Sequence, residues 1–373
     1  MIVHIVLPID STAIAQASVQ PNSTIMNDHD LESKISQITN DYVSKRENVA
    51  LTIGVIQQGH FYIKGFSKIS DTNHAIPNAQ TIYEIGSVTK VFTGTVLAKL
   101  VNDGTVALDD PIRLYLPAAI VNQLSPSVQS ITLRQLATHT SGLPRLPDSF
   151  LINIKDPTNP YVDYTAPEMY AALPDLTLLS EPGQRYEYSN FGMGLLGHLL
   201  SLKTSQSYEE LVKEIICQPL GMTDTTIHLT LDQQQRLTLG HSPDGTLTSN
   251  WDFDVMAPAG AFRSTTEELL TFLQANLHES DTQMAAILAR SQERYFEVSE
   301  ALAIGLAWHI WTLRNGQVVH WHNGGTGGYV SFVGFDKVKQ TGVVVLSNYG
   351  DALANDSSVD EMAVRILMEL SSQ

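Results

Sequence analysis

A serine and a lysine three residues apart stand at the start of an apolar stretch of this chain. Ser87 and Lys90 lie in Gly-Ser-Val-Thr-Lys-Val-Phe, and Ser-x-x-Lys occurs nowhere else in the sequence. Residues i and i+3 share one face of a helix, so the Lys90 amine can reach the Ser87 hydroxyl. A serine needs a neighbouring base to become a nucleophile, and a lysine serves once its pKa falls from ~10.4 towards ~7–8. The pair therefore predicts acylation of Ser87 near a helix N-terminus, whose dipole favours developing negative charge.

A second short motif, Tyr188-Ser-Asn190, precedes another apolar helical pattern over 191–202. Side chains two residues apart in an extended segment point the same way, which aims Tyr188 and Asn190 at one pocket. A phenol beside a lysine can relay a proton, and an amide can bind a substrate carbonyl. A second interpretation makes Asn190 the N-cap of the following helix, and the two interpretations are compatible.

A third motif, His322-Asn-Gly-Gly, ends a predicted strand and continues into Thr-Gly-Gly. Gly324 and Gly325 allow the backbone to approach a substrate closely and to expose N–H groups as oxyanion donors. A cationic or donor side chain at His322 can hold a substrate carboxylate, and an unperturbed histidine titrates near ~6.5. The alternative interpretation is a flexible glycine turn between two strands.

Three further patterns carry weaker signals. The glycine spacing of dinucleotide-binding motifs occurs in Gly192-Met-Gly-Leu-Leu-Gly197. Because an extended loop rather than a strand precedes it, we interpret these glycines as residues that allow a helix to pack closely. His320 and His322 would share one strand face, as zinc ligands can, yet no nearby Asp, Glu or Cys completes a ligand set. His139 is expected to bond backbone groups in a turn. Gly-x-Ser-x-Gly is absent from the sequence, which counts against an α/β-hydrolase fold.

Both ends of the chain have β patterns. Alternation over 51–56 and 61–64 predicts one hairpin. Segments 306–313 and 317–322, joined by Asn315-Gly316, predict another, and two more strands follow over 329–335 and 342–348. Helices are expected over 28–45 and at the C-terminus. The closing helix has a predicted buried face of Val359, Met362, Ala363, Ile366, Leu367 and Leu370.

The region between these ends, 87–280, consists mostly of helical patterns with Pro- and Gly-rich connections. We therefore predict an α/β (α+β) architecture. A central antiparallel sheet from 28–86 and 281–371 is flanked by helices, and the mostly helical region 87–280 is inserted in the middle. Residues 28–371 form a single domain in this prediction, with the site in a cleft between the sheet and the helical region.

The composition narrows the range of partners. The 373 residues carry a net charge of −17, which argues against nucleic acid and anionic membranes because both require basic patches. No apolar run reaches the about 18 residues that a membrane span needs. The single cysteine, Cys217, excludes an intramolecular disulfide and any two-cysteine metal or redox site. We expect no metal and no cofactor, and the sequence leaves the oligomeric state open.

Residues 1–27 are predicted to be a leader or a signal-like remnant without regular structure. Residues 1–8 are apolar and 11–17 are rich in small side chains, which is typical of the end of a secretory signal, although a basic start is missing and Asp10 interrupts the apolar stretch. We expect an extracytoplasmic protein, periplasmic or secreted, with a cytoplasmic location as the alternative.

The three motifs occur once each and in one order, and together they resemble the serine β-lactamase and penicillin-binding-protein superfamily. The likeness is strongest to its class C and DD-peptidase branch and covers about residues 33–348. Other segments that resemble the family are Leu-Arg-Gln-Leu-Ala-Thr-His-Thr-Ser-Gly-Leu-Pro (133–144), Pro-Gly-Gln-Arg-Tyr-Glu-Tyr-Ser-Asn (182–190), Pro-Leu-Gly-Met-Thr-Asp-Thr (219–225) and Ala-Gly-Ala-Phe-Arg-Ser (259–264).

The resemblance implies a β-lactamase/transpeptidase-like fold and an acyl-enzyme mechanism. Ser87 would attack a carbonyl, with Lys90 as the base and Tyr188 passing the proton to the leaving group. Backbone N–H groups of Ser87 and Gly325 would form the oxyanion hole. Asn190 would orient the substrate amide, and His322 would bind or polarise the substrate. Class C β-lactamases have lysine where this chain has His322, a departure more similar to DD-carboxypeptidases and to some esterases of the family.

Three functions follow from these expectations. The first is a D-alanyl-D-alanine carboxypeptidase/endopeptidase or β-lactamase that acts on β-lactams or peptidoglycan-type peptides. The second is a carboxylesterase with the same residues. The third, a non-catalytic protein that binds cell-wall fragments, is disfavoured because such a protein needs no base beside Ser87. The expected partner is therefore a small-molecule or peptide substrate.

Overall fold

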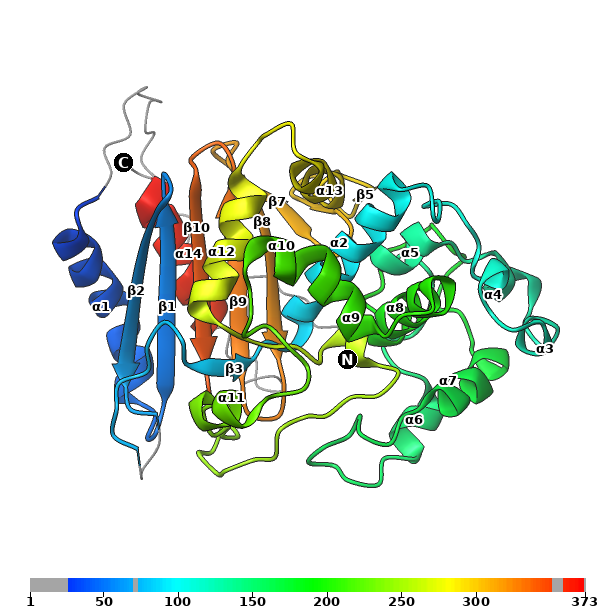
Figure 1. Cartoon of the computed structure of the whole chain (residues 1–373), viewed down its shortest axis with the longest axis horizontal. Helices are drawn as coiled ribbons and strands as arrows, with labels where there is room; N and C mark the ends of the chain where they lie inside the picture. Colours follow the sequence, from blue (N-terminus) through cyan, green and yellow to red (C-terminus); the bar gives the residue numbers. More distant parts are fainter. Residues whose placement is uncertain (1–25, 70–72, 351–357, 372–373) are drawn as a thin grey trace.

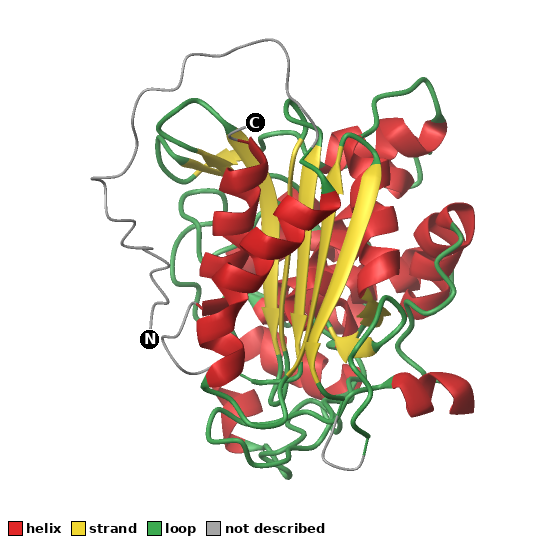
Figure 2. Cartoon of the chain, turned by 90° about the vertical axis from the view of Figure 1, so that its left-hand side faces the viewer, coloured by secondary structure: helices red, strands yellow, loops and turns green. Residues whose placement is uncertain are grey.

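The computed structural model describes residues 26–69, 73–350 and 358–371. A large antiparallel sheet lies between two layers of helices, and a mainly helical region extends to one side of it (Figure 1). Figure 2 shows the sheet from its edge strand, with helices on both of its faces. No helix within the described ranges is long and apolar enough to cross a membrane.

The large sheet joins the two ends of the chain. Its strand order is β2-β1-β10-β9-β8-β7-β6-β5. The strands are β1 (Ala50–Gln57), β2 (His60–Ser67), β5 (Phe296–Glu297), β6 (Leu302–Ile304), β7 (His309–Thr312), β8 (Val318–Gly325), β9 (Val330–Asp336) and β10 (Thr341–Ser347). Because β1 pairs antiparallel with β10, the N-terminal hairpin and the C-terminal strands form one sheet, as the sequence predicts.

One face of this sheet is covered by α1 (Asp28–Ser44) and α14 (Ser358–Ser371). The six apolar residues that the sequence predicts on the inner side of α14 are all buried. They pack with side chains of α1 and of the central strands into one apolar cluster. A helix stripe with this spacing gains stability only when it is buried, so α14 is held by packing rather than by propensity.

The opposite face is covered by α12 (Thr266–Leu277), which packs on β1, β9 and β10. Behind it lie α2 (Thr89–Asn102), α8 (Asn190–Thr204) and α13 (Gln283–Ser291), with α2 in contact with both of the others. The remaining α-helices are α3 (Ala118–Val121), α4 (Pro126–Ser130), α5 (Leu133–Ala137), α6 (Asp148–Ile152), α7 (Ala166–Ala172), α9 (Tyr208–Val212), α10 (Gln218–Leu220) and α11 (Leu231–Arg236).

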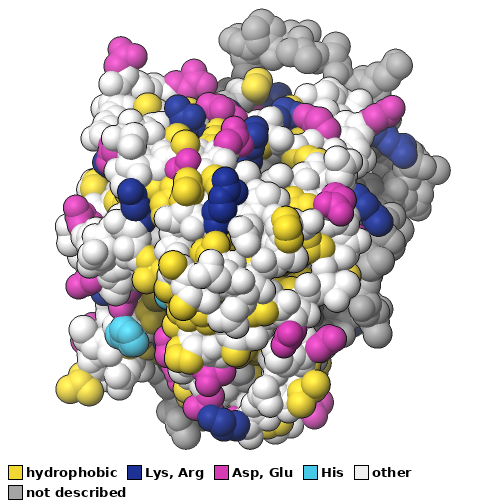
Figure 3. All heavy atoms as spheres, turned by 90° about the vertical axis from the view of Figure 1, so that its right-hand side faces the viewer, with side chains coloured by type: hydrophobic (Ala, Val, Ile, Leu, Met, Phe, Trp, Pro, Cys, Tyr) yellow, Lys and Arg dark blue, Asp and Glu magenta, His cyan; other side chains and the backbone are white. Residues whose placement is uncertain are grey.

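A second, two-stranded sheet of β3 (Ile82–Glu84) and β4 (Arg263–Thr265) fixes the entry to α2. On the side of the helical region that Figure 3 shows, Lys and Arg side chains are interspersed with Asp, Glu and apolar side chains. That face therefore has no broad basic patch of the kind that binds nucleic acid.

One predicted strand boundary is wrong. The strand predicted over 306–313 begins only at His309, because Ala307 has a φ of 70° and the backbone turns there. The helix α12 lies within the region that is predicted to be mostly helical, and it packs on strands of the large sheet. Most of the predicted leader, residues 1–25, lies outside the described residues, and α1 begins at Asp28, where the sequence predicts it.

Candidate active site

Ser87 and Lys90 are brought together by a short 3-10 turn, Gly86–Val88, that leads directly into α2. Lys90 is fully buried, whereas Ser87 is partly exposed to solvent. The Lys90 Nζ donates hydrogen bonds to Ser87 Oγ at 2.7 Å and to the Ala259 carbonyl at 2.6 Å. The buried Lys90 amine thus contacts the hydroxyl of the partly exposed Ser87, as the spacing predicts.

The surroundings of Lys90 favour its neutral form. Burial is the main cause that holds its pKa well below the usual value of a lysine, and the positive charge of Arg145 adds to it. Removing a charged amine from water is costly, so the amine sheds its proton instead. A neutral amine in contact with a hydroxyl is able to accept that hydroxyl's proton.

Backbone of β8 passes directly against the turn that holds Ser87. A Cβ atom added to Gly324 would lie 2.1 Å from the Ile85 carbonyl oxygen and 2.8 Å from the Ser87 nitrogen. A Cβ on Gly86, whose φ is 47°, would lie 2.7 Å from the Gly325 nitrogen. Both positions therefore require glycine. The glycines of β8 bring its backbone close to the backbone around Ser87.

The pairing of β8 turns the Gly325 N–H towards this turn. Thr326 donates its N–H to the Tyr329 carbonyl at 2.9 Å, and antiparallel pairs alternate between bonded and non-bonded positions. Gly325, which pairs with Val330, is therefore at a non-bonded position with its N–H directed away from β9. The Ser87 N–H begins a helical turn and has no acceptor in the described ranges, so two backbone donors face the same space.

Tyr188 lies against the same two side chains. Its ring centroid is 5.0 Å from the Lys90 Nζ. The ring also packs on His139, with the centroids 4.4 Å apart. Burial raises the pKa of Tyr188 to about 12, although the nearby Ser87 hydroxyl and the charge of Arg145 act in the opposite direction. The phenol therefore keeps its proton near neutral pH.

His139 holds this tyrosine from behind. It is fully buried with a φ of 57°, and its Nδ1 accepts the Ser189 N–H at 3.1 Å. The histidine thus bonds backbone, as expected, and connects the Thr-His-Thr-Ser-Gly turn to the Tyr-Ser-Asn segment. Burial is the main cause that holds the His139 pKa well below its usual value, so its ring is neutral.

Asn190 does not cap its helix. The N-cap of α8 is Ser189, whose Oγ accepts the Gly192 N–H at 2.8 Å, so the interpretation of Asn190 as the cap is wrong. Instead, the Asn190 Nδ2 donates to the Tyr161 hydroxyl at 3.4 Å, and its buried Oδ1 has no partner among the described residues. An amide oxygen without a partner is unusual in a protein interior and is available to a ligand.

His322 is fully buried, and its Nδ1 lies 2.6 Å from the Asn323 carbonyl oxygen. A carbonyl only accepts, so Nδ1 carries the proton and the neutral ring presents the Nε2 lone pair. Burial is the main cause that holds the His322 pKa well below its usual value. The sequence predicts a cationic or donor side chain at His322 that titrates near ~6.5, whereas burial favours the neutral ring.

The weaker patterns have structural explanations. Cβ atoms on Gly194 and Gly197 would lie 2.6 Å from Met256 and 2.1 Å from Pro258, so these glycines allow close packing of α8. His320 stacks on Phe335, with the centroids 5.0 Å apart. Within the described ranges, no three His, Cys, Asp or Glu side chains come together as a metal site would need.

Two residues near Ser87 lie outside the three sequence motifs. Arg145 holds its guanidinium carbon 5.1 Å from the Tyr188 ring centroid, and Tyr161 contacts Asn190. A third contribution, the Ala259 carbonyl, comes from backbone and is invisible in residue types. Arg145 directly follows the 133–144 segment, and the residue order there does not indicate its proximity to Tyr188.

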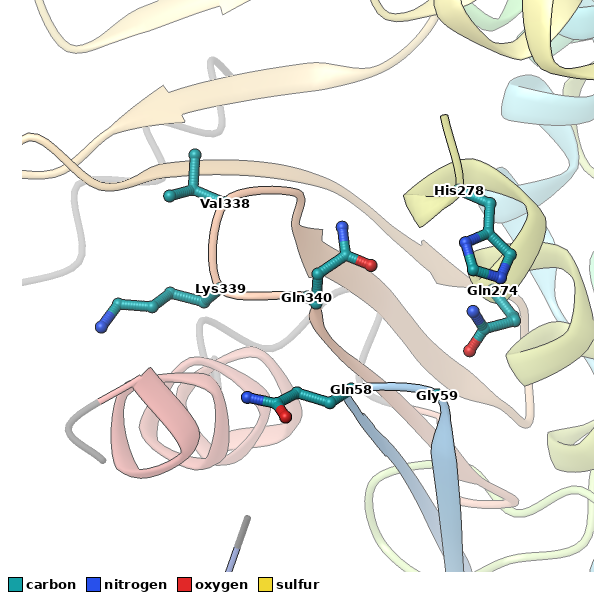
Figure 4. A pocket seen from close by; sticks show the side chains of 7 residues that line it. All are labelled: Gln58, Gly59, Gln274, His278, Val338, Lys339 and Gln340. Atoms are coloured by element: carbon teal, nitrogen blue, oxygen red, sulfur yellow. The ribbon is translucent and has the colours of Figure 1, made fainter. Parts of the chain in front are cut away.

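A cavity of about 290 Å³ lies far from this site, at the other end of the sheet strands (Figure 4). It is lined by Gln58, Gly59, Gln274, His278, Val338, Lys339 and Gln340. The pairing of Gln57 with Thr341 places it at one end of β1, whereas Leu51 and Ser347 lie at the end that faces Gly325. None of the predicted site residues lines the cavity, so we do not treat it as the active site.

The family of the chain follows from residues 35–363, which match the family model described as Beta-lactamase. The match covers most of the chain, including all three motifs, and the chain belongs to the beta-lactamase family. Its fold is also that of class C beta-lactamases. A crystal structure of a class C beta-lactamase superposes with a TM-score of 0.80 at 20% identity, over 92% of this chain and 99% of the other.

Two curated relatives give the family more detail. A human beta-lactamase-like protein is 33% identical over 63% of this chain and 47% of its own length. The D-alanyl-D-alanine-carboxypeptidase/endopeptidase AmpH of Escherichia coli (strain K12) is 28% identical over 79% of this chain and 78% of its own length. The chain spans about half to two thirds of the length of several curated relatives that it matches.

Proposed function

We propose that this protein is a serine hydrolase that forms an acyl-enzyme through Ser87. The observation that carries the proposal is the 2.7 Å hydrogen bond from a buried Lys90 amine to the partly exposed Ser87 hydroxyl. A structural lysine would pair with a carboxylate, whereas this one contacts a hydroxyl and a carbonyl. Membership of the beta-lactamase family supports the same conclusion.

Acylation starts when neutral Lys90 takes the Ser87 proton. The serine oxygen bonds to the substrate carbonyl carbon, and the resulting oxyanion is held by the N–H groups of Ser87 and Gly325. The bond to the leaving group then breaks while the Tyr188 phenol supplies the leaving group's proton. Lys90 returns a proton to Tyr188, which restores both side chains. A Tyr188 pKa of about 12 fits a proton relay better than a resting phenolate base.

Deacylation reverses these roles. A water molecule attacks the acyl carbonyl, its proton passes to the Tyr188 and Lys90 pair, and the Ser87 oxygen leaves with a proton from the same pair. Asn190 orients the substrate amide during both steps, because its Oδ1 is buried without a partner and can accept an amide N–H. No metal or cofactor takes part in these proposed reaction steps.

The substrate class that we favour is a D-alanyl-D-alanine type peptide or a β-lactam. The name of the AmpH relative supports the peptide, and membership of the beta-lactamase family supports the β-lactam. A carboxylesterase is the second candidate, and one observation favours it. The His322 Nε2 is a lone-pair acceptor in a neutral ring, so it cannot attract a substrate carboxylate as a lysine would. We also propose an extracytoplasmic location, where cell-wall peptides are found.

The proposal is tested by intact-mass measurement after exposure to a penicillin, to a D-Ala-D-Ala peptide ester and to a fluorophosphonate. We expect one adduct per chain, mapped by digestion to the peptide that contains Ser87. Ser87→Ala should lose the adduct entirely, because the variant has no nucleophile at this position. Ser130→Ala, at an exposed serine of the helical region, should label like the natural protein. An adduct that persists in Ser87→Ala would overturn the proposal.

A further inference from the structure

Arg145 is an exposed cation beside the site, and its guanidinium makes no ion pair or hydrogen bond within the described part of the chain. Its guanidinium carbon stands 5.1 Å from the Tyr188 ring centroid. Neighbouring arginines behave differently, since Arg134 pairs with Asp109 and Arg185 lies 3.8 Å from Glu187. An arginine presents five donors in a planar fork that matches a carboxylate, and all five are free here for a ligand.

The backbone of Arg145 is fastened to the Tyr-Ser-Asn segment on both sides. The Ser189 Oγ donates to the Pro144 carbonyl at 2.7 Å, and the Phe191 N–H donates to the Arg145 carbonyl at 3.1 Å. These bonds enclose Asn190 between their donors, so the Arg145 side chain starts from a fixed point next to the proposed amide-binding residue. A group held this way is preorganised rather than merely nearby.

The other polar groups around the reacting serine carry no resident charge that would satisfy Arg145. Lys90, His139 and His322 are buried and favour their neutral forms. The remaining neighbours that sense the Arg145 charge are tyrosines 161, 186 and 188, which are acceptors at best. The site therefore has an exposed cation on its Asn190 side, and no carboxylate of the described residues pairs with this cation.

We propose that Arg145 is a substrate-binding residue that pairs with a carboxylate on the acyl part of the substrate. The acyl part is favoured over the leaving group because Arg145 lies on the side of Asn190, which we assign to the substrate amide. The inference rests on the proposed function and narrows it to substrates whose acyl chain bears an anion. Arg145 would also provide the cationic group for binding a carboxylate that the neutral His322 does not provide.

Two matched esters test this assignment. N-succinyl-D-alanine p-nitrophenyl ester has a carboxylate at the end of its acyl chain, and the corresponding succinamide ester has a neutral carboxamide there. The natural protein should prefer the carboxylate ester in kcat/KM. Arg145→Gln should reduce this preference by about 10- to 100-fold, the scale of one charge-assisted hydrogen-bonded pair. Arg145→Lys should retain part of the preference, because the charge remains without the planar fork.

The controls separate binding from positioning. Arg113→Gln, at an exposed arginine of the helical region, should leave the preference as it is. If Arg145→Gln slowed both esters equally, Arg145 would only position the Tyr188 ring, and the inference would be wrong. It would also be wrong if the preference did not change. Fluorophosphonate labelling of Ser87 in the natural protein and in Arg145→Gln keeps the two proposals apart. Both proteins should be labelled if only the assignment of Arg145 is wrong, whereas absence of labelling in the natural protein would overturn the proposed function.

Discussion

The two faces of the large sheet bury different kinds of side chains. Against α1 and α14 the cluster is almost entirely apolar, and a polar pair within it, the Tyr42 hydroxyl and Ser347 Oγ, is bonded at 2.8 Å. The face towards α2 and α8 buries a larger apolar cluster and, in addition, Lys90 together with the rings of His139 and His322. Neither imidazole Nε2 has a partner among the described residues.

This difference separates stability from chemistry within one fold. Apolar burial gains about 25 cal/mol per Å², whereas an unsatisfied buried polar group costs about 1–3 kcal/mol. Both faces therefore stabilise the sheet through apolar burial, and the Lys90 face also carries the cost of the unsatisfied imidazole nitrogens of its site. Active sites commonly have such a cost, because groups arranged for a reaction are not arranged for folding.

The largest effect is expected on replacing the buried lysine. Lys90→Met should lower the rate of Ser87 acylation by about 10²- to 10⁴-fold, the usual size of a general acid–base contribution. Stopped-flow acylation with an activated ester measures this loss. Lys99→Met is the matched control, because Lys99 is on the same helix but pairs with Asp103 near the surface. Near-normal acylation in Lys90→Met would mean that another group takes the serine proton.

The same variant should be more stable than the natural protein at neutral pH. The folded-state pKa of Lys90 lies below the unfolded value of ~10.4, so the unfolded chain binds the extra proton. Stability therefore rises with pH up to about 10.4 in the natural protein, and this part of the slope should disappear in Lys90→Met. Melting temperatures from pH 7 to 10 compare the two proteins. A variant with an unchanged slope would show that Lys90 is charged when buried.

Leu367→Ala tests the other face. Leu367 is 2% exposed within the α14 cluster, so its truncation should lower the free energy of unfolding by about 2–5 kcal/mol. Acylation of the folded fraction should stay within about twofold, because the cavity forms on the far side of the sheet from Ser87. Denaturant unfolding and active-site titration measure the two quantities. Leu202→Ala, at a leucine that is 41% exposed, should cost about 0.5 kcal/mol or less.

Much of this division could be predicted from the sequence. The spacing of Ile366, Leu367 and Leu370 predicts which side of α14 is buried, and the Ser87 to Lys90 spacing predicts their contact. Both depend on helix geometry, which is local. The protonation of His322 could not be predicted, because it depends on the Asn323 carbonyl and on burial against His309.

Arg145 was missed for a related reason. Its position depends on two hydrogen bonds from the Tyr-Ser-Asn region, more than forty residues further along the chain. No local pattern encodes a contact of this kind, and the exposed arginine in a Pro-rich loop has the composition of an ordinary surface segment. Its proximity to Tyr188 is a property of the tertiary structure alone.

The smallest effect is expected from a histidine of the site face that lies outside the chemistry. Burial is the main cause that lowers the His320 pKa to about 4, while a hydrogen bond with the Gln292 backbone opposes it. Below pH ~6.5, the ordinary pKa of histidine, the unfolded chain binds a proton at His320 that the folded chain does not bind. The neutral His320 therefore contributes fully to stability above pH ~6.5, and this contribution is lost as the pH falls towards about 4.

His320→Phe should remove this loss while keeping the ring that stacks on Phe335. We expect the variant to gain about 1–2 kcal/mol of stability relative to the natural protein between pH 6.5 and 4.5. Urea unfolding at several pH values measures the difference. Tyr42→Phe, on the opposite face, removes one hydrogen bond to Ser347 and should change stability by about 1 kcal/mol at every pH in this range. If the stabilities of both variants changed with pH in the same way, the loss of stability in acid would not come from the site face. The contrast between the two faces would then be limited to the side chains that each face buries.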